Sequence, residues 1–267
     1  MEEPLAGAPS VRTLERGVDL LVALEQAGQP QRLVDLARAT GIHKVTAQRL
    51  LAVLERRGLV EKEGGRYRVG LAAVPLAHAY FLENDLTKVA FHVLQELAAA
   101  TEETASMYVR LGFGRVVVQR VEGKHPLRYV MPIGQRLPLY IGSGKVLAAA
   151  MPEEELQEML RSVGEIRRVT GEVWARDEYL AELRRIRQQG FCVSTNERTL
   201  GVTSVAAPIL RPDGVAVAAV SVVGPPESVT LDKIPQLSVE VRRAAQAIAE
   251  RYRGLWSPVV PAGFMPQ

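Results

Sequence analysis

The sequence predicts an α+β protein with two domains: a winged helix–turn–helix at residues 10–70 and an α/β domain with a central antiparallel sheet at residues 86–255. Three observations predict this fold class. A length of 267 residues suits about two domains. The first seventy residues show helical periodicity followed by a hairpin signal, and from about residue 86 helix and strand patterns follow one another. A linker helix at residues 71–85 and a loose tail at residues 256–267 complete the expected organisation.

The first domain is expected to hold three helices and a hairpin. Apolar spacing predicts a helix that ends at Gly28, a second at residues 32–40 and a third at residues 44–57. Gly41 stands where a sharp turn needs a residue that tolerates positive φ. Gly64 and Gly65, between strand patterns at 59–63 and 66–69, are a two-residue hairpin signal. The apolar stripes are Leu14, Val18, Leu21 and Val22; Leu33, Leu36 and Ala37; and Ala47, Leu50, Leu51 and Leu54.

The second domain mixes helices and strands. The run at residues 215–223 is apolar at both odd-numbered and even-numbered positions, so both faces of the sheet should be covered there. The expected helices are residues 86–101, a helix that begins at 144, the charged amphipathic helices 153–160 and 177–189, and a closing helix at 232–253. The expected strands are 105–111, 115–121, 127–131, 191–195, 202–210 and 215–223.

Composition excludes several classes of protein. Cys192 is the only cysteine, which excludes an intrachain disulfide framework and a cysteine-based zinc cluster, and the four histidines show no ligand spacing. We therefore expect neither metal nor cofactor. No apolar run reaches the roughly 18 residues that a membrane helix needs, and the first thirty residues lack a signal-peptide layout. These features predict a soluble cytoplasmic protein.

Positive charge gathers in the first domain. Residues 10–70 hold eleven basic and seven acidic side chains, an excess of four charges, whereas the whole chain carries +3. The remainder is therefore near neutral. A small basic module attached to a larger neutral one is typical of nucleic-acid binding joined to a second activity, although an ordinary solvated surface also fits the charge alone.

The third helix is the candidate for reading double-stranded DNA. With its apolar stripe buried, its other face enters the major groove in a helix–turn–helix. Gln48 can pair with adenine, Arg49 with guanine or a phosphate, and Val45 can touch a thymine methyl group. Three-helix units also serve as protein-binding modules, so that alternative stays open. The expected DNA contacts are Lys44, Val45, Thr46, Gln48 and Arg49 on the helix, with Arg66 and Arg68 on the hairpin gripping phosphates.

Residues 10–255 resemble the IclR family of bacterial transcriptional regulators. The motifs that carry the resemblance are LVDLARATG at 33–41, KVTAQRLL at 44–51, YRVG at 67–70, PLR at 126–128, GQRLPL at 134–139, GK at 144–145, GFCV at 190–193, GV at 201–202, AAP at 206–208 and SVVGP at 221–225. The resemblance implies a GAF-like effector-binding domain, a homodimer or a tetramer formed as a dimer of dimers, and promoter binding controlled by a small metabolite.

Some positions depart from the family pattern. Val45 stands where the family usually has serine, so one hydrogen bond to DNA is expected to be missing. In the second domain Asn196 stands in place of a common acidic residue, Ser204 in place of a frequent cysteine, and Val223 in place of a serine. Since such positions tend to line the ligand pocket, the effector of another family member cannot be transferred to this chain.

The resemblance brings together the residues of an expected effector pocket: Tyr129, Leu137, Gly142, Ser143, Asn196, Ser204 and Ser221. Apolar walls with a few polar groups are typical of small-ligand sites. Backbone amides near Ser143, at a helix start, favour an anion, and Asn196 in place of an acid removes a negative charge. An organic or aromatic acid is therefore the expected ligand. Alternatively, Ser204 and Ser221 only cap neighbouring backbone.

The sequence matches two enzyme motifs, the P-loop and the nucleophile elbow, only in part. The segment from Gly142 to Lys145 lacks the first glycine and the final Ser or Thr of a P-loop, and Ser143 fails the pattern of a nucleophile elbow. Cys192 lies in an apolar strand pattern typical of a core residue. We predict no catalytic residue and no enzyme activity. The alternative function is a metabolite-binding or hydrolytic α/β domain whose first module mediates assembly without binding DNA.

Overall fold

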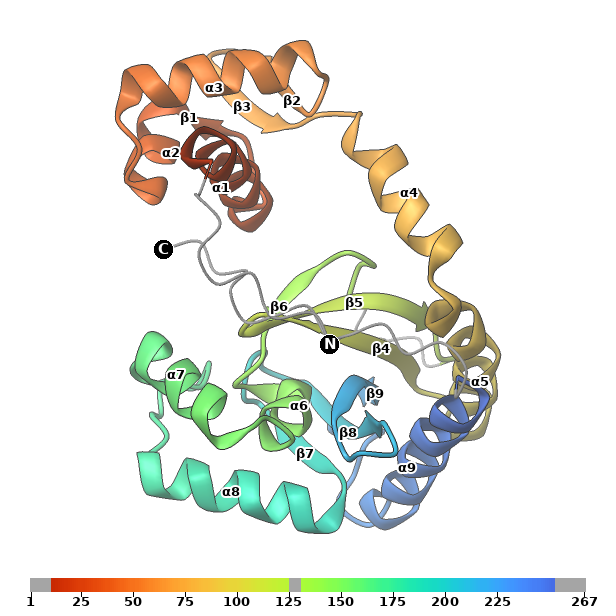
Figure 1. Cartoon of the computed structure of the whole chain (residues 1–267). Helices are drawn as coiled ribbons and strands as arrows, with labels where there is room; N and C mark the ends of the chain where they lie inside the picture. The colour runs from red at the N-terminus through yellow and green to blue at the C-terminus, as the bar shows by residue number, and fades with distance from the viewer. Residues whose placement is uncertain (1–10, 125–130, 253–267) are drawn as a thin grey trace. The chain divides into compact units, whose positions relative to one another are not determined.

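The structure is a computed structural model that describes residues 11–124 and 131–252 (Figure 1). These residues form two compact units, and the division falls between Glu83 and Asn84. The expected linker at residues 71–85 is helix α4 (Ala73–Glu83), which belongs to the first unit, followed by the start of the next helix. None of the helices in the described part of the chain is long and apolar enough to cross a membrane.

The first unit is a winged helix–turn–helix. It consists of α1 (Arg12–Ala27), α2 (Leu33–Thr40), α3 (Lys44–Arg56) and a three-stranded antiparallel sheet. The sheet order is β1 (Gln31–Arg32), β3 (Arg66–Val69), β2 (Val60–Glu63). The three helices and the hairpin confirm the prediction. The two-residue strand β1 was not predicted, because so short a strand has no periodicity to detect.

The core of the first unit corrects the predicted stripe of α1. Leu20 and Leu24 are the buried residues of this helix, whereas Leu14 and Val18 are exposed. Since both buried residues lie in the second half of α1, only that half packs against the other helices. The prediction was wrong because helical spacing alone does not show where a helix leaves the core. The buried core is Leu20, Leu24, Leu36, Ile42, Ala47, Leu51, Val60 and Tyr67.

The second unit is built on a six-stranded antiparallel sheet with the order β6-β5-β4-β9-β8-β7. Its strands are β4 (Thr104–Leu111), β5 (Gly114–Val121), β6 (Arg136–Pro138), β7 (Cys192–Thr195), β8 (Thr203–Leu210) and β9 (Ala216–Gly224). Its helices are α5 (Asp85–Thr101), the short 3-10 helix η1 (Gly142–Gly144), α6 (Lys145–Ala149), α7 (Glu153–Val163), α8 (Arg176–Gln189) and α9 (Ile234–Arg251).

Helices cover both faces of this sheet. In Figure 1, α5 and α9 lie together on one side, and α6, α7 and α8 lie on the other. Strand β9 is central and eight of its nine residues are buried, which confirms the expectation from the apolar run at 215–223. Ala219 and Val223 of β9 pack in the same cluster as Tyr179 and Leu183 of α8, so this face of the sheet meets the helices that follow η1.

One expected strand falls mostly outside the described residues, and one observed strand was not expected. The expected strand at 127–131 lies outside the described residues except for Met131, which is not in a strand. Strand β6 was not predicted. It is three residues long, lies at the sheet edge and ends in Pro138, a residue that is confined to such positions because it cannot donate to a ladder.

Candidate functional site

Helix α3 exposes the side chains that were predicted to read DNA. Ala47 and Leu51 are buried against the rest of the unit. The opposite face presents Lys44, Gln48 and Arg49, all exposed, together with Val45, which is 50% exposed, and Thr46, which is half-buried. The turn before the helix passes through Gly41, whose φ is 64°. The helix start is therefore open to a groove while the helix is held by its buried stripe.

The hairpin of the first unit carries Arg66 and Arg68 on exposed positions of β3. The turn residues Gly64 and Gly65 have φ of 57° and 75°, as a two-residue hairpin with both central residues at positive φ requires. Arg66 donates a hydrogen bond to the carbonyl oxygen of Pro30 at 3.3 Å. Arg68 forms ion pairs with Glu61 at 2.9 Å and Glu63 at 3.3 Å. Arg68 must exchange these carboxylates to bind a phosphate.

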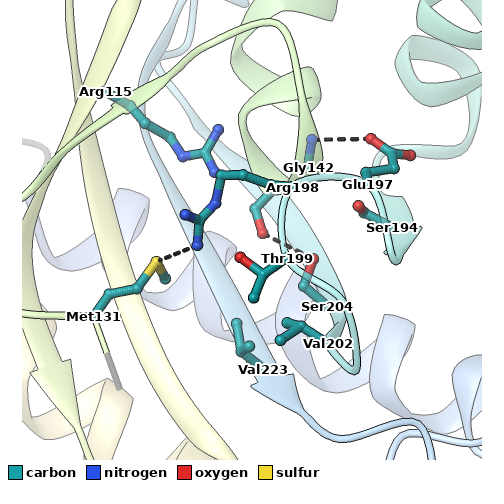
Figure 2. Close-up of a pocket in the computed structure, with 11 residues that line it drawn as sticks. Arg115, Met131, Gly142, Ser194, Glu197, Arg198, Thr199, Val202, Ser204 and Val223 are labelled. Carbon is teal, nitrogen blue, oxygen red and sulfur yellow. Dashed lines mark hydrogen bonds between the residues drawn. The ribbon is translucent and has the colours of Figure 1, made fainter. Parts of the chain in front are cut away.

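A cavity of about 30 Å³ lies in the second unit, where η1 meets the turn between β7 and β8 (Figure 2). This volume has room for water but not for an organic molecule, so an organic ligand has to displace side chains on entry. Polar and charged groups dominate the lining, with Met131, Val202 and Val223 as its apolar part. The described residues that line it are Arg115, Met131, Gly142, Ser143, Ser194, Glu197, Arg198, Thr199, Val202, Ser204 and Val223.

Three of the predicted effector residues line this cavity: Gly142, Ser143 and Ser204. The two serines are buried, and the hydroxyl of Ser143 donates to the hydroxyl of Ser204 at 3.0 Å. Because this bond joins η1 to β8, it closes one side of the cavity. The structure therefore brings together the loop and the strand that the sequence suggested.

Three other predicted effector residues that the structure describes do not line the cavity. Leu137 is buried in the hydrophobic core on β6. The hydroxyls of Ser221 and Tyr108 are hydrogen-bonded to each other at 3.0 Å. Asn196 closes a turn instead: its φ is 53°, and its side-chain oxygen accepts a hydrogen bond from the amide of Gly201 at 2.7 Å. Tyr129 lies outside the described residues.

A carboxylate does reach the cavity, from Glu197, the residue after Asn196. Glu197 is buried, and its Oε2 accepts a hydrogen bond from the backbone amide of Gly142 at 3.0 Å. The amide at the start of η1, which was expected to receive a ligand anion, is therefore already used by the protein. Oε1 of Glu197 is hydrogen-bonded to Nζ of Lys145.

Lys145 is the centre of a buried charge cluster. It is 1% exposed, contacts Glu182 of α8 at 3.2 Å as well as Glu197, and lies 5.2 Å from the ring centroid of Trp174. Burial by itself lowers the pKa of Lys145, but the charge and hydrogen bond of Glu197, together with the charge of Glu182, contribute to a net pKa above its ordinary value. Burial likewise raises the pKa of Glu182, yet Lys145 and Arg185 bring that pKa below its ordinary value. Lys145 and Glu182 are therefore both ionised at neutral pH.

Arg115 of β5 is the second buried cation at the cavity. It is 2% exposed, and its Nη1 donates to the carbonyl oxygens of Pro138 at 2.6 Å and Ile141 at 2.9 Å. Its guanidinium stands 5.1 Å from the ring centroid of Tyr108. Burial lowers the pKa of Arg115 to about 10, so it remains protonated at neutral pH.

Sequence reasoning missed five of the polar residues at this cavity, among them Thr199 in the turn after β7. A charged residue among inward-facing apolar neighbours of β5 was the available signal for Arg115, since such residues are almost never buried without a reason. The other three, Ser194, Glu197 and Arg198, lie in and just after β7, and their contacts depend on the path of the following turn. Within the described residues no group of three His, Cys, Asp or Glu side chains is placed to hold a metal ion.

Comparison with protein families identifies both units. Residues 13–64 match the IclR helix-turn-helix domain, and residues 78–250 match the C-terminal domain of bacterial transcriptional regulators of the IclR type. The chain is 31% identical over 261 residues to the HTH-type transcriptional repressor AllR of Salmonella typhi, which covers 96% of this chain and 95% of that protein. It is 29% identical over 250 residues to AllR of Escherichia coli K12, covering 92% of each chain.

Solved structures show the same fold. The crystal structure of Thermotoga maritima IclR matches with a TM-score of 0.63 and 26% identity, over 91% of this chain and 100% of that chain. An IclR transcriptional regulator from Alicyclobacillus acidocaldarius matches with a TM-score of 0.77 and 22% identity, over 92% of this chain and 100% of that chain.

Proposed function

Because this chain belongs to the IclR family of bacterial transcriptional regulators, we propose that it reads promoter DNA as a homodimer under the control of a small organic acid. Members of this family are DNA-binding transcription factors rather than enzymes, and they bind small-molecule effectors. The alternative of a hydrolytic domain with a non-DNA-binding module is therefore set aside. The site of action is the cytoplasm, where bacterial promoters lie.

The observation that carries the DNA-reading proposal is the exposed face of α3. Lys44, Gln48 and Arg49 present a cation, an amide and a guanidinium from the start of one helix, which is the part that meets base edges in this motif. A guanidinium pairs with guanine and an amide with adenine through two bonds each. The exposed Arg66 of the wing supports contacts to phosphates beside the groove.

Assembly as a dimer follows from the small reach of one module. A single winged unit contacts a short half-site, and a two-fold dimer on an inverted repeat supplies the remaining specificity. Exposed apolar side chains on α4, among them Leu76 and Leu82, support contact with a second copy. By analogy with the family resemblance, we propose that two dimers pair into a tetramer through their second units.

Selection of duplexes from a random pool by the full chain tests this reading. We expect the enriched sites to contain an inverted repeat with half-sites about one helical turn apart. Light scattering at micromolar concentration should give at least twice the chain mass of 29.2 kDa. A monomer that enriches no sequence would contradict the proposal.

The cavity beside η1 supports an organic acid as the effector. Two arginines, Arg115 and Arg198, line it, while the carboxylate of Glu197 is matched by Lys145. The remaining polar side chains are the hydroxyls of three serines and Thr199, which can donate to a carboxylate. The ligand controls DNA binding only if it favours one arrangement of the two DNA-reading modules.

Filling the cavity should abolish effector binding. In Ser143→Trp, an indole occupies the space beside Ser204, so calorimetry with small organic and aromatic acids should find a ligand for the parent and none for the variant. Ser162→Trp is the control, because Ser162 is exposed on α7 away from the cavity. Unchanged affinity in Ser143→Trp would place the effector elsewhere.

A further inference from the structure

We propose that Arg115 is the group that receives the effector's carboxylate, and that the cavity it faces selects compact aliphatic acids. This inference rests on the proposed function, since it assigns the specificity of the same site. It goes further by naming one residue that was not expected from the sequence, and by narrowing the ligand from organic or aromatic acids to small ones.

Arg115 is buried without an ion-pair partner among the described residues, although the charge of Glu197 acts on it from a distance and raises its pKa. None of the carboxylates in residues 11–124 and 131–252 forms an ion pair with it, and its buried Nε has no hydrogen-bond partner there. The two hydrogen bonds that it makes within these residues, both from Nη1, go to backbone carbonyls. A buried charge whose partners are neutral carries a large desolvation cost. Holding a loop by two carbonyls needs only a neutral donor, so the charge itself calls for another explanation.

The unused side of the guanidinium faces the cavity. A Cβ built on Gly142 would lie 3.6 Å from Nη2 of Arg115 and 3.9 Å from Oγ of Ser194. Because residue 142 is glycine, this space between the guanidinium and the hydroxyl stays open. Figure 2 shows the side chain of Arg115 reaching from β5 toward Gly142 and Arg198. The cavity thus offers a guanidinium edge and a hydroxyl to one small group.

Two positively charged side chains, Arg115 and Arg198, line this cavity. Burial is the main cause of the lowered pKa of Arg115, and the nearby charge of Arg198 lowers that pKa further. An anion placed between the two guanidinium groups relieves both effects. Glu197 does not supply it, because its two oxygens are held by Lys145 and by the amide of Gly142.

The geometry points to the chemical class of the ligand. A guanidinium presents parallel N–H groups that match a carboxylate, and an uncharged amide of the same shape loses the charge-assisted part of the bond. The cavity of about 30 Å³, with Met131, Val202 and Val223 as its apolar walls, is smaller than any organic acid, so the ligand has to displace side chains. A compact aliphatic acid displaces less of the lining than a benzene ring does, and this favours the smaller ligand.

Matched acids and amides test this assignment. Ligand-observed NMR on the full chain would give the affinities of lactate, lactamide, propionate, propionamide and benzoate. We expect the parent to bind each acid at least about 10-fold more tightly than its amide, the size of one charge-assisted hydrogen bond, and to bind benzoate more weakly than propionate. In Arg115→Gln the acid and amide should bind within about twofold of each other.

Arg110→Gln is the matched control. Arg110 on the neighbouring strand β4 also donates to a backbone carbonyl, that of Gly112, and is mostly buried, but it pairs with Glu155 and does not line the cavity. Its acid-to-amide ratio should equal that of the parent. Arg115→Lys keeps the positive charge but lacks the parallel N–H groups of a guanidinium. Its acid-to-amide ratio should therefore fall between those of the parent and Arg115→Gln. If Arg115→Gln does not fold, as judged by circular dichroism, Arg115→Lys decides alone.

A parent that binds none of the acids, that shows no preference over the amides, or that prefers benzoate overturns the inference. So does an Arg115 variant that keeps the parental ratio. The same protein preparations are also tested for binding of the selected duplex. That measurement separates a failure of the role of Arg115 from a failure of the proposed function. If the parent does not bind the selected duplex, the proposal that this chain is a DNA-binding regulator is wrong. If it binds the duplex but Arg115→Gln keeps the parental acid-to-amide ratio, only the role of Arg115 is wrong.

Discussion

Replacing Arg49 with alanine is expected to lower the affinity for a selected duplex by about 1–3 kcal/mol while changing the affinity for random DNA much less. Arg49 is exposed on α3 beside Gln48, so its truncation removes a base contact without opening the core. Gln48→Ala should act in the same direction. Mobility shifts on one selected and one random duplex measure both affinities.

The wing provides the contrast to this result. Arg66→Ala should weaken binding to all duplexes evenly and reduce the slope of affinity against salt, because a phosphate contact carries no sequence information. Arg68→Ala should cause a smaller loss of affinity and a smaller change of the salt slope, since Arg68 forms ion pairs with Glu61 and Glu63 in the free protein. Arg161→Ala, an exposed change on α7, is the control. If Arg49→Ala binds both duplexes as the parent does, α3 does not read DNA.

Replacing Lys145 with methionine is expected to lower the free energy of unfolding of the second unit by about 3–5 kcal/mol. Methionine fills a similar volume but leaves Glu197 buried without its cation and takes one partner from Glu182. Urea unfolding followed by circular dichroism measures the loss. Lys88→Met is the control: Lys88 also pairs with a carboxylate, that of Asp85, but its side chain is 57% exposed, so its loss should cost no more than about 1 kcal/mol.

The pH dependence of stability should report the same cluster. The pKa of Glu182 is lowered in the folded chain, so its contribution is present above its usual pKa of 4.5 and is lost as pH falls through the folded value. The pKa of Lys145 is raised, so its contribution is present below its usual 10.5 and is lost as pH rises through the folded value. In Lys145→Met, the free energy of unfolding should therefore fall less steeply as the pH is lowered through the acid range. A variant as stable as Lys88→Met would show that Lys145 does not hold this cluster together.

Local sequence alone determined the three helices and the hairpin of the winged helix–turn–helix, though neither strand β1 nor the buried residues of α1. Helical spacing defined the buried stripe of α3 at Ala47 and Leu51, and the face opposite followed from 3.6 residues per turn. Gly41 and the pair Gly64 and Gly65 marked the turns because few other residues adopt their positive φ. Each of these properties depends on neighbours within a few positions, so no knowledge of distant contacts was needed.

The lining of the cavity was decided by tertiary structure. Asn196 and Glu197 are adjacent, and periodicity does not show which of them reaches η1. The left-handed conformation of Asn196 and its bond to Gly201 close the turn, and the carboxylate that enters the cavity is that of Glu197. Arg115 arrives from β5, far away in the sequence, because β5 lies between β4 and β6 in the sheet. Residue spacing records local geometry, whereas strand order and turn conformation determine which distant side chains meet.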